Sequence, residues 1–223
     1  MPSLPTQRGR ASPVWRLRRL PLTTGFASAL AAAEICYASL SAHHAARVAG
    51  WASTNVTRLT SEPIGPLAAS VFVIDDYRIL WLVLGTLGCA LVEARFGWRR
   101  TLLVAATAQL GGTAVSEGIV WWRVDHARLP DSALHQHDVG VSYVVVGLLS
   151  AAVLAARPIA MRLIAGLSLV AIGPNLLAGL TRLEVSPVGH LTAFVGSGIF
   201  GGVLLVRDSR RPRIHDQSSL RTK

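Results

Sequence analysis

Six long blocks of apolar residues, each almost free of charge, constrain the fold of this chain more than any other feature. Each block is near the ~20 residues that a helix needs to cross the hydrocarbon core of a bilayer. The blocks do not alternate between apolar and polar residues, and this favours helices over strands. We therefore expect an all-α, polytopic membrane protein whose six helices lie near 22–41, 78–94, 101–122, 139–156, 159–180 and 186–206.

The composition supports this fold class. Hydrophobic residues make up 51% of the 223 residues and charged residues only 15%, whereas a soluble domain carries about a quarter charged residues. The net charge of +10 is concentrated at the termini and in short connections. A nucleic-acid partner would need basic residues on a folded polar face, so we expect the lipid bilayer as a partner and no nucleic acid.

The arginines also predict the orientation. If both termini are cytoplasmic, the larger share of the 22 lysines and arginines lies inside, in 1–20, 95–100, 157–162 and 207–223. Cytoplasmic loops carry such an excess, and an odd number of helices would place one basic terminus outside. We expect a basic cytoplasmic segment 1–20, a membrane domain 21–206 and a disordered basic cytoplasmic tail 207–223.

The first apolar block has a second reading. Arginines, an apolar stretch and small residues at 39–42 also resemble a cleaved signal peptide. The length of the block and the presence of Glu34 favour a retained helix.

Two long loops, 42–77 and 123–138, fall on the predicted outer side. Within the first loop, the apolar piece Ile64–Ile74 is too short to span and predicts an interfacial or re-entrant segment. The second loop holds three histidines, His126, His135 and His137. Their spacing follows no established metal-site pattern, so we expect no metal there. No motif indicates a cofactor or a particular oligomeric state.

A serine and a histidine on separate blocks form a candidate catalytic pair. Ser142 lies in the sequence Gly140-Val141-Ser142-Tyr143 at the outer end of block 139–156, and His190 lies near the outer end of block 186–206. A serine becomes a nucleophile when a base such as histidine takes its proton. The alternative is that the serine only packs helices and the histidine donates to a backbone carbonyl.

These residues resemble those of the rhomboid family of intramembrane serine proteases, over roughly residues 25–206. The family has six core helices, a serine motif that opens the fourth helix and a histidine on the sixth. The turn Val92-Glu93-Ala94-Arg95-Phe96-Gly97 is similar to the family's turn after the second helix. A divergent actinobacterial rhomboid-like group is the most similar in three short motifs: Ser53-Thr54-Asn55, Asp138 to Tyr143, and Gly189-His190.

The resemblance implies a bacterial inner-membrane protein with Ser142 and His190 as catalytic residues. It also implies an oxyanion or substrate region around Gly140, Tyr143, Asn55 and Asp138.

Several supporting residues depart from the family pattern. Tyr143 stands where active members carry a small glycine, and Val146 stands where they carry an aromatic ring. The oxyanion donors of the second helix fall near Tyr77 and Trp81, which do not replace an asparagine donor, and the Trp-Arg pair of the family's first loop is absent. The loss of one oxyanion donor costs roughly 10²–10³ in rate.

Three functions therefore stay open. The first is a protease that cleaves transmembrane segments, and the second is a catalytically silent relative that binds them. The third, a small transporter or channel, would need a continuous polar path joining Glu34, Glu117 and Asn175. Glu34 should have a partner or a function because a carboxylate is costly in lipid, whereas Glu117, near the outer end of its block, is expected to reach water.

Overall fold

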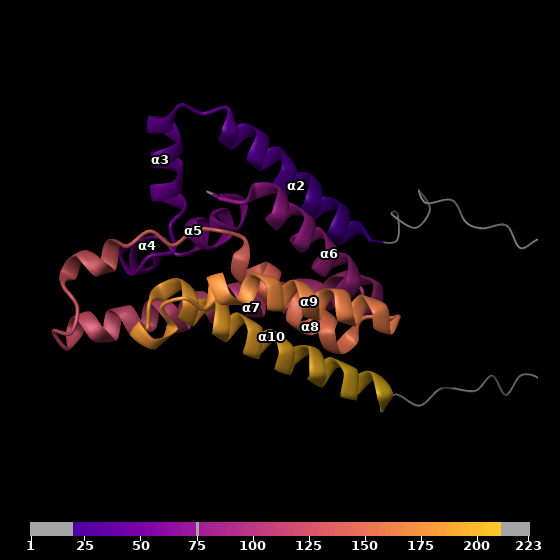
Figure 1. Ribbon diagram of the computed structural model, residues 1–223. Coiled ribbons are helices and arrows are strands. Elements are labelled where there is room, and N and C mark those ends of the chain that lie inside the picture. Colours follow the sequence, from indigo (N-terminus) through magenta and orange to yellow (C-terminus); the bar gives the residue numbers. More distant parts are fainter. Residues whose placement is uncertain (1–19, 75, 211–223) are drawn as a thin grey trace, which may run out of the picture.

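The computed structural model describes residues 20–74 and 76–210, and all regular structure in these ranges is helical, as the sequence predicts. Most of the two expected basic segments, 1–20 and 207–223, lies outside the described residues. Six longer helices form the body of the molecule (Figure 1): α2 Pro21–Ala38, α6 Arg78–Phe96, α7 Trp98–Asp125, α8 Ser142–Ala155, α9 Ile159–Leu176 and α10 Val185–Ser209.

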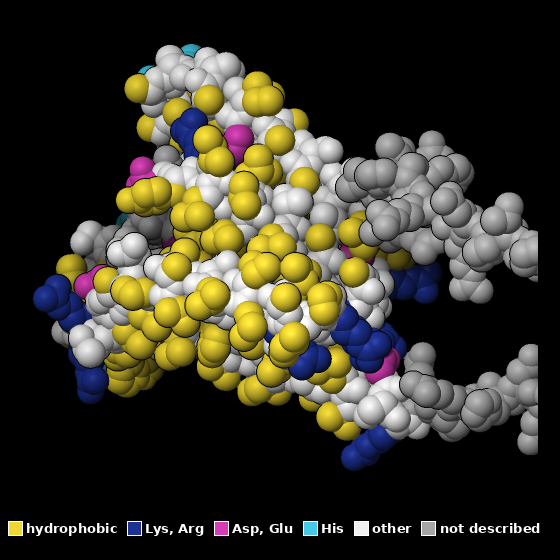
Figure 2. All heavy atoms as spheres, turned by 45° about the vertical axis from the view of Figure 1, so that its right-hand side comes forward, with side chains coloured by type: hydrophobic (Ala, Val, Ile, Leu, Met, Phe, Trp, Pro, Cys, Tyr) yellow, Lys and Arg dark blue, Asp and Glu magenta, His cyan; other side chains and the backbone are white. Residues whose placement is uncertain are grey.

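Three of these helices, α6, α9 and α10, are long and apolar enough to cross a membrane, and α8 is a shorter apolar helix. Hydrophobic side chains cover the middle of the face seen in Figure 2, and lysine and arginine side chains gather toward its two ends. This distribution is typical of a helical membrane protein, which must keep charge out of the hydrocarbon core.

Helix α8 is the centre of the bundle. Most of its 14 residues are buried, because α6, α7, α9 and α10 pack around it. At Gly147 a Cβ atom would overlap Ala108 of α7 and Ser197 of α10, so only glycine allows the three backbones to approach this closely. Its start at Ser142, rather than near 139, leaves Asp138 and Gly140 in the connection before the helix.

Helix α2 is attached to the bundle by two buried carboxylates. Glu93 of α6 accepts the backbone N–H groups of Leu22 and Thr23, at 3.0 Å and 2.7 Å, and also the Thr23 hydroxyl. These are first-turn N–H groups that have no acceptor within the helix. At the other end, Glu34 pairs with Arg78 at 3.2 Å and accepts the N–H of Ile74, which confirms that this carboxylate has partners.

The first long loop, residues 42–77, contains more structure than the sequence predicted. It forms three short helices and a turn of 3₁₀ helix: α3 Ala42–Ala52, α4 Val56–Ser61, α5 Ile64–Ala69 and η1 Ser70–Phe72. Two further 3₁₀ turns, η2 Asp131–His135 and η3 Leu180–Arg182, lie in later connections. Helix α5 and η1 occupy the piece 64–74, and the Gln109 side chain of α7 donates to Ser70 there.

Candidate functional site

The two long loops, 42–77 and 123–138, meet at Ser53, Thr54 and Asp138. The N–H of Thr54 donates to the Asp138 carbonyl at 2.8 Å, and its hydroxyl donates to the Asp138 carboxylate at 3.1 Å. The N–H of Asp138 donates to the Ser53 hydroxyl at 3.0 Å. Ser53 and Thr54 are fully buried, so these bonds join segments 84 residues apart in a site shielded from solvent.

Asn55 supports this junction from one side. It caps α4 by accepting the N–H of Arg58 at 3.0 Å, and its amide donates to Ser53 at 3.2 Å. The oxygen and the nitrogen of the Asn55 side-chain amide thus both form hydrogen bonds within residues 53–58. The sequence placed Asn55 in the oxyanion region, whereas here its side chain orders the turn that carries Ser53 and Thr54.

Tyr143 connects Asp138 to the helical bundle. Its hydroxyl donates to the two carboxylate oxygens of Asp138 at 3.3 Å and 3.2 Å. Its ring meets the His190 imidazole edge-on, with 5.0 Å between the centroids and 80° between the planes. At Gly189 a Cβ atom would overlap this ring, and at Gly112 it would press against it, so two glycines make the space that Tyr143 fills.

Asp138 is half-buried, and the loss of solvent affects its pKa. Desolvation raises the pKa of the Asp138 carboxyl above its ordinary value, and the hydrogen bonds from Thr54 and Tyr143 partly offset the effect by favouring the charged form.

His190 is buried and oriented by backbone. Its Nδ1 lies 3.1 Å from the Leu176 carbonyl and 3.3 Å from the Ser186 hydroxyl. A carbonyl only accepts, so the proton is assigned to Nδ1 and the lone pair to Nε2. Nε2 is buried and has no hydrogen-bond partner among residues 20–74 and 76–210.

Ser142 is half-buried at the first position of α8. Within the described chain no hydrogen bond joins its hydroxyl to His190, whose known partners are Leu176 and Ser186. Successive residues of an α-helix point about 100° apart. Tyr143, the next residue along α8, presents its ring to the imidazole.

Gly140 sets the approach to α8. Its φ of +133° lies in a region that favours glycine, and its N–H donates to the Ser70 carbonyl at 3.0 Å. The bond ties the start of α8 to η1 of the first loop. Gly140 therefore positions Asp138 and Ser142 on either side of one turn.

Glu117 of α7 borders the same region and is buried, contrary to the expectation that it reaches water. The backbone N–H of Val56 interacts with its carboxylate. Its Oε1 and the hydroxyl of Thr113, one turn earlier, have no partner in the described ranges. The first loop covers this end of α7. Glu117 is therefore buried, although its place near the end of an apolar block predicted contact with water.

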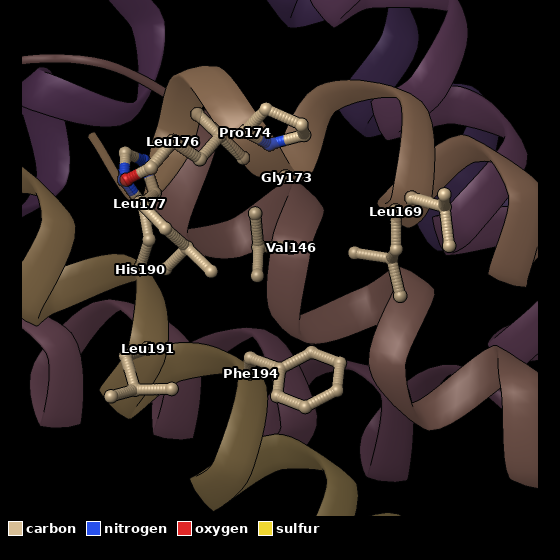
Figure 3. Close-up of a pocket in the computed structure, with 10 residues that line it drawn as sticks. Val146, Leu169, Gly173, Pro174, Leu176, Leu177, His190, Leu191 and Phe194 are labelled. Carbon is tan, nitrogen blue, oxygen red and sulfur yellow. The ribbon is translucent and has the colours of Figure 1, made fainter.

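A cavity of about 450 Å³ lies beside His190, between α9 and the α8–α10 pair. Its lining is almost entirely apolar (Figure 3). Gly173 and Pro174 of α9 lie along one side of the cavity, and the Val146 side chain of α8 points toward its middle. The small Val146 side chain leaves this space open where a large ring would fill it.

No metal centre is formed in the part of the chain that the structure describes, where no three His, Cys, Asp or Glu side chains come together. The polar groups described above, from Ser53, Thr54, Asp138 and Tyr143 to the buried His190 imidazole, can orient a peptide group or transfer a proton.

The family model for the rhomboid-like protein matches residues 16–209, most of the chain. This chain belongs to the rhomboid-like family. No curated protein and no solved structure matches the chain. In this rhomboid-like protein the three short motifs singled out in the sequence meet at one place: Ser53 to Asn55 and Asp138 form the loop junction, and Tyr143 joins it to Gly189-His190. The sequence supplied the motifs but not Tyr143 as their link.

Proposed function

We propose that this rhomboid-like protein crosses a bacterial inner membrane six times, with both termini cytoplasmic. The six spans are α2, α6, α7, α8, α9 and α10. Support comes from the start of α2 and the end of α10, which lie at the same end of the molecule (Figure 1). The excess of arginines in the connections at that end is the second support.

Within this topology, the protein binds transmembrane segments of other membrane proteins without cutting them. The observation that carries the proposal is the contact between Tyr143 and His190, because the imidazole packs against a tyrosine ring and, among the described residues, forms no hydrogen bond with the Ser142 hydroxyl. The positions of the family's oxyanion donors support it too. Tyr77 is exposed at the start of α6, and Trp81 packs against the apolar core.

Helix α9 and its cavity are the surface proposed to receive a client helix. Ala165 is the one buried residue of α9, and four of its large apolar side chains are exposed along one stripe: Ile159, Leu163, Leu167 and Val170. The adjoining cavity offers an apolar recess at the level of His190. A helix bound there would bury this stripe and fill the recess.

Labelling with a fluorophosphonate, which reacts with activated serines, tests whether the protein lacks serine-protease activity. Wild type, Ser142→Ala and His190→Ala are compared in folded, detergent-purified form. Ser150→Ala is the matched control, because Ser150 lies on the same helix and donates to the Phe194 carbonyl. We expect no label at Ser142. Labelling of wild type and Ser150→Ala that both other variants abolish would establish the protease instead.

Client binding is tested by a photo-crosslinking residue at Val170, with Leu103 of α7, also an exposed apolar residue, as the control position. We expect adducts with single-span membrane proteins from Val170 and few from Leu103. Equal yields at the two positions would contradict a specific surface on α9.

An intramembrane serine protease is the second candidate. It would use Ser142 as nucleophile and His190 as base, with Gly140 and Asp138 beside the reacting group. The unpartnered Nε2 favours it, because that nitrogen carries the lone pair a base needs. A transporter is not favoured, because Asn175 is exposed on α9 while Glu34 and Glu117 are buried with different partners.

A further inference from the structure

A basic hollow lies at the turn between α6 and α7. It encloses about 450 Å³ and is lined by one aspartate, two aromatic residues, a glycine and three arginines: Asp208, Phe96, Trp98, Gly97, Arg95, Arg99 and Arg100. Three guanidinium groups against one carboxylate leave the hollow with an excess of positive charge.

The single carboxylate is shared by two arginines. Asp208 pairs with Arg100 at 2.6 Å and with Arg95 at 3.2 Å. The Nε of Arg95 is buried and has no partner among the described residues. Arg99 is exposed, and its guanidinium lies 5.2 Å from the centre of the Trp98 ring. The hollow therefore retains donors that Asp208 does not satisfy.

The start of α7 adds to the attraction for an anion. Gly97 caps this 28-residue helix without a side-chain hydrogen bond, and the first turn contains no acidic residue. Its free N–H groups carry partial positive charge at the edge of the hollow.

The surroundings favour a lipid over a soluble anion. Trp98 is about half exposed, as is usual for an aromatic residue at the level of lipid headgroups. One turn further into α7, Leu102 and Leu103 expose apolar surface along which acyl chains can lie. Figure 2 shows basic side chains around an acidic one at the edge of the apolar face.

We propose that this hollow binds the phosphodiester headgroup of an anionic phospholipid. Arg99 and Arg95 contact the phosphate, Trp98 packs at headgroup level, and the acyl chains follow α7. Basic pockets between transmembrane helices bind anionic headgroups by the same electrostatics. Asp208 acts against binding, because its charge neutralises two of the arginines.

The test measures lipid retention by native mass spectrometry on the full chain, titrated with phosphatidylglycerol or phosphatidylcholine in detergent. We expect preferential retention of phosphatidylglycerol. Arg99→Gln should weaken it about fivefold, the effect of one cation near a charged surface. Arg157→Gln, which removes an exposed arginine from the α8–α9 connection, is the matched control and should have little effect.

Asp208→Asn gives an effect of opposite sign, with about fivefold tighter retention. Its melting temperature in phosphatidylcholine identifies any loss of fold caused by breaking the two ion pairs. Inorganic phosphate is the last arm. Equal retention of both lipids, equal effects of Arg99→Gln and Arg157→Gln, or binding of inorganic phosphate as tight as that of phosphatidylglycerol would each overturn the proposal.

Discussion

The hydroxyl of Tyr143 donates to both carboxylate oxygens of Asp138, at 3.3 Å and 3.2 Å, across the start of helix α8. Asp138 is half-buried, and Tyr143→Phe leaves its carboxyl with one donor fewer. We expect the free energy of unfolding to fall by about 1–3 kcal/mol, measured by denaturant titration in mild detergent. Tyr77→Phe removes an exposed hydroxyl and should change it by less than about 0.5 kcal/mol. Equal losses would contradict the role of Tyr143.

Asp138 should make stability depend on pH. Burial raises its pKa in the folded protein, so the folded state binds the proton more tightly than the unfolded state does. This contribution is full below the ordinary aspartate pKa of about 3.9, and it is lost as the pH rises through the raised folded value. Asp138→Asn should therefore flatten the fall in unfolding free energy across that window.

The control for this pH series is Asp131→Asn, an exposed carboxylate in η2 of the same loop. Its curve should keep the wild-type slope. Parallel curves for wild type and Asp138→Asn would show that Asp138 does not cause the dependence.

Gly189 lies against the ring of Tyr143, and the added methyl group of Gly189→Ala would overlap that ring. We expect a loss of about 1–3 kcal/mol from overpacking. Gly196→Ala on the same helix meets its nearest neighbour, Thr107, at 3.9 Å, so it should be neutral or stabilise through helix propensity. Melting temperatures of the two variants check the prediction, and a shift of the same sign in both would contradict it.

Glu93→Gln should loosen α2. The carboxylate accepts two N–H groups and one hydroxyl, whereas a glutamine has one acceptor oxygen and presents an N–H₂ group to the remaining donors. We expect a loss of about 3 kcal/mol and faster hydrogen exchange at the start of α2. Glu62→Gln, an exposed site, is the control. Unchanged exchange in α2 would contradict the attachment.

The helical class could be predicted because long, continuous apolar blocks are typical of helices in an apolar environment. The shorter helices of the first loop could not be predicted from the sequence. Helices α4 and α5 contain six residues each, too few to show a period or to be stable alone. They depend on tertiary contacts, such as the bond of Ser70 with Gln109. Glu117 was misjudged for the same reason, because a distant loop covers it.

The site shows a similar division. Ser142 and His190 are conspicuous in the sequence, but whether they meet depends on the rotation of α8, which spacing along the chain does not encode. In the structure the neighbouring residue, Tyr143, contacts the imidazole. Gly112 and Gly189 carried the missing signal, because both leave room for a large side chain from a third helix.

The attachment of α2 by Glu93 constrains the order in which the protein is assembled. The N–H of Thr23 and its acceptor are 70 residues apart, so α2 is synthesised before Glu93. Helix α2 can complete the hydrogen bonding of its first turn only after the later helix α6 has been made. Until α6 has been made, other acceptors such as water must receive the hydrogen bonds of those N–H groups.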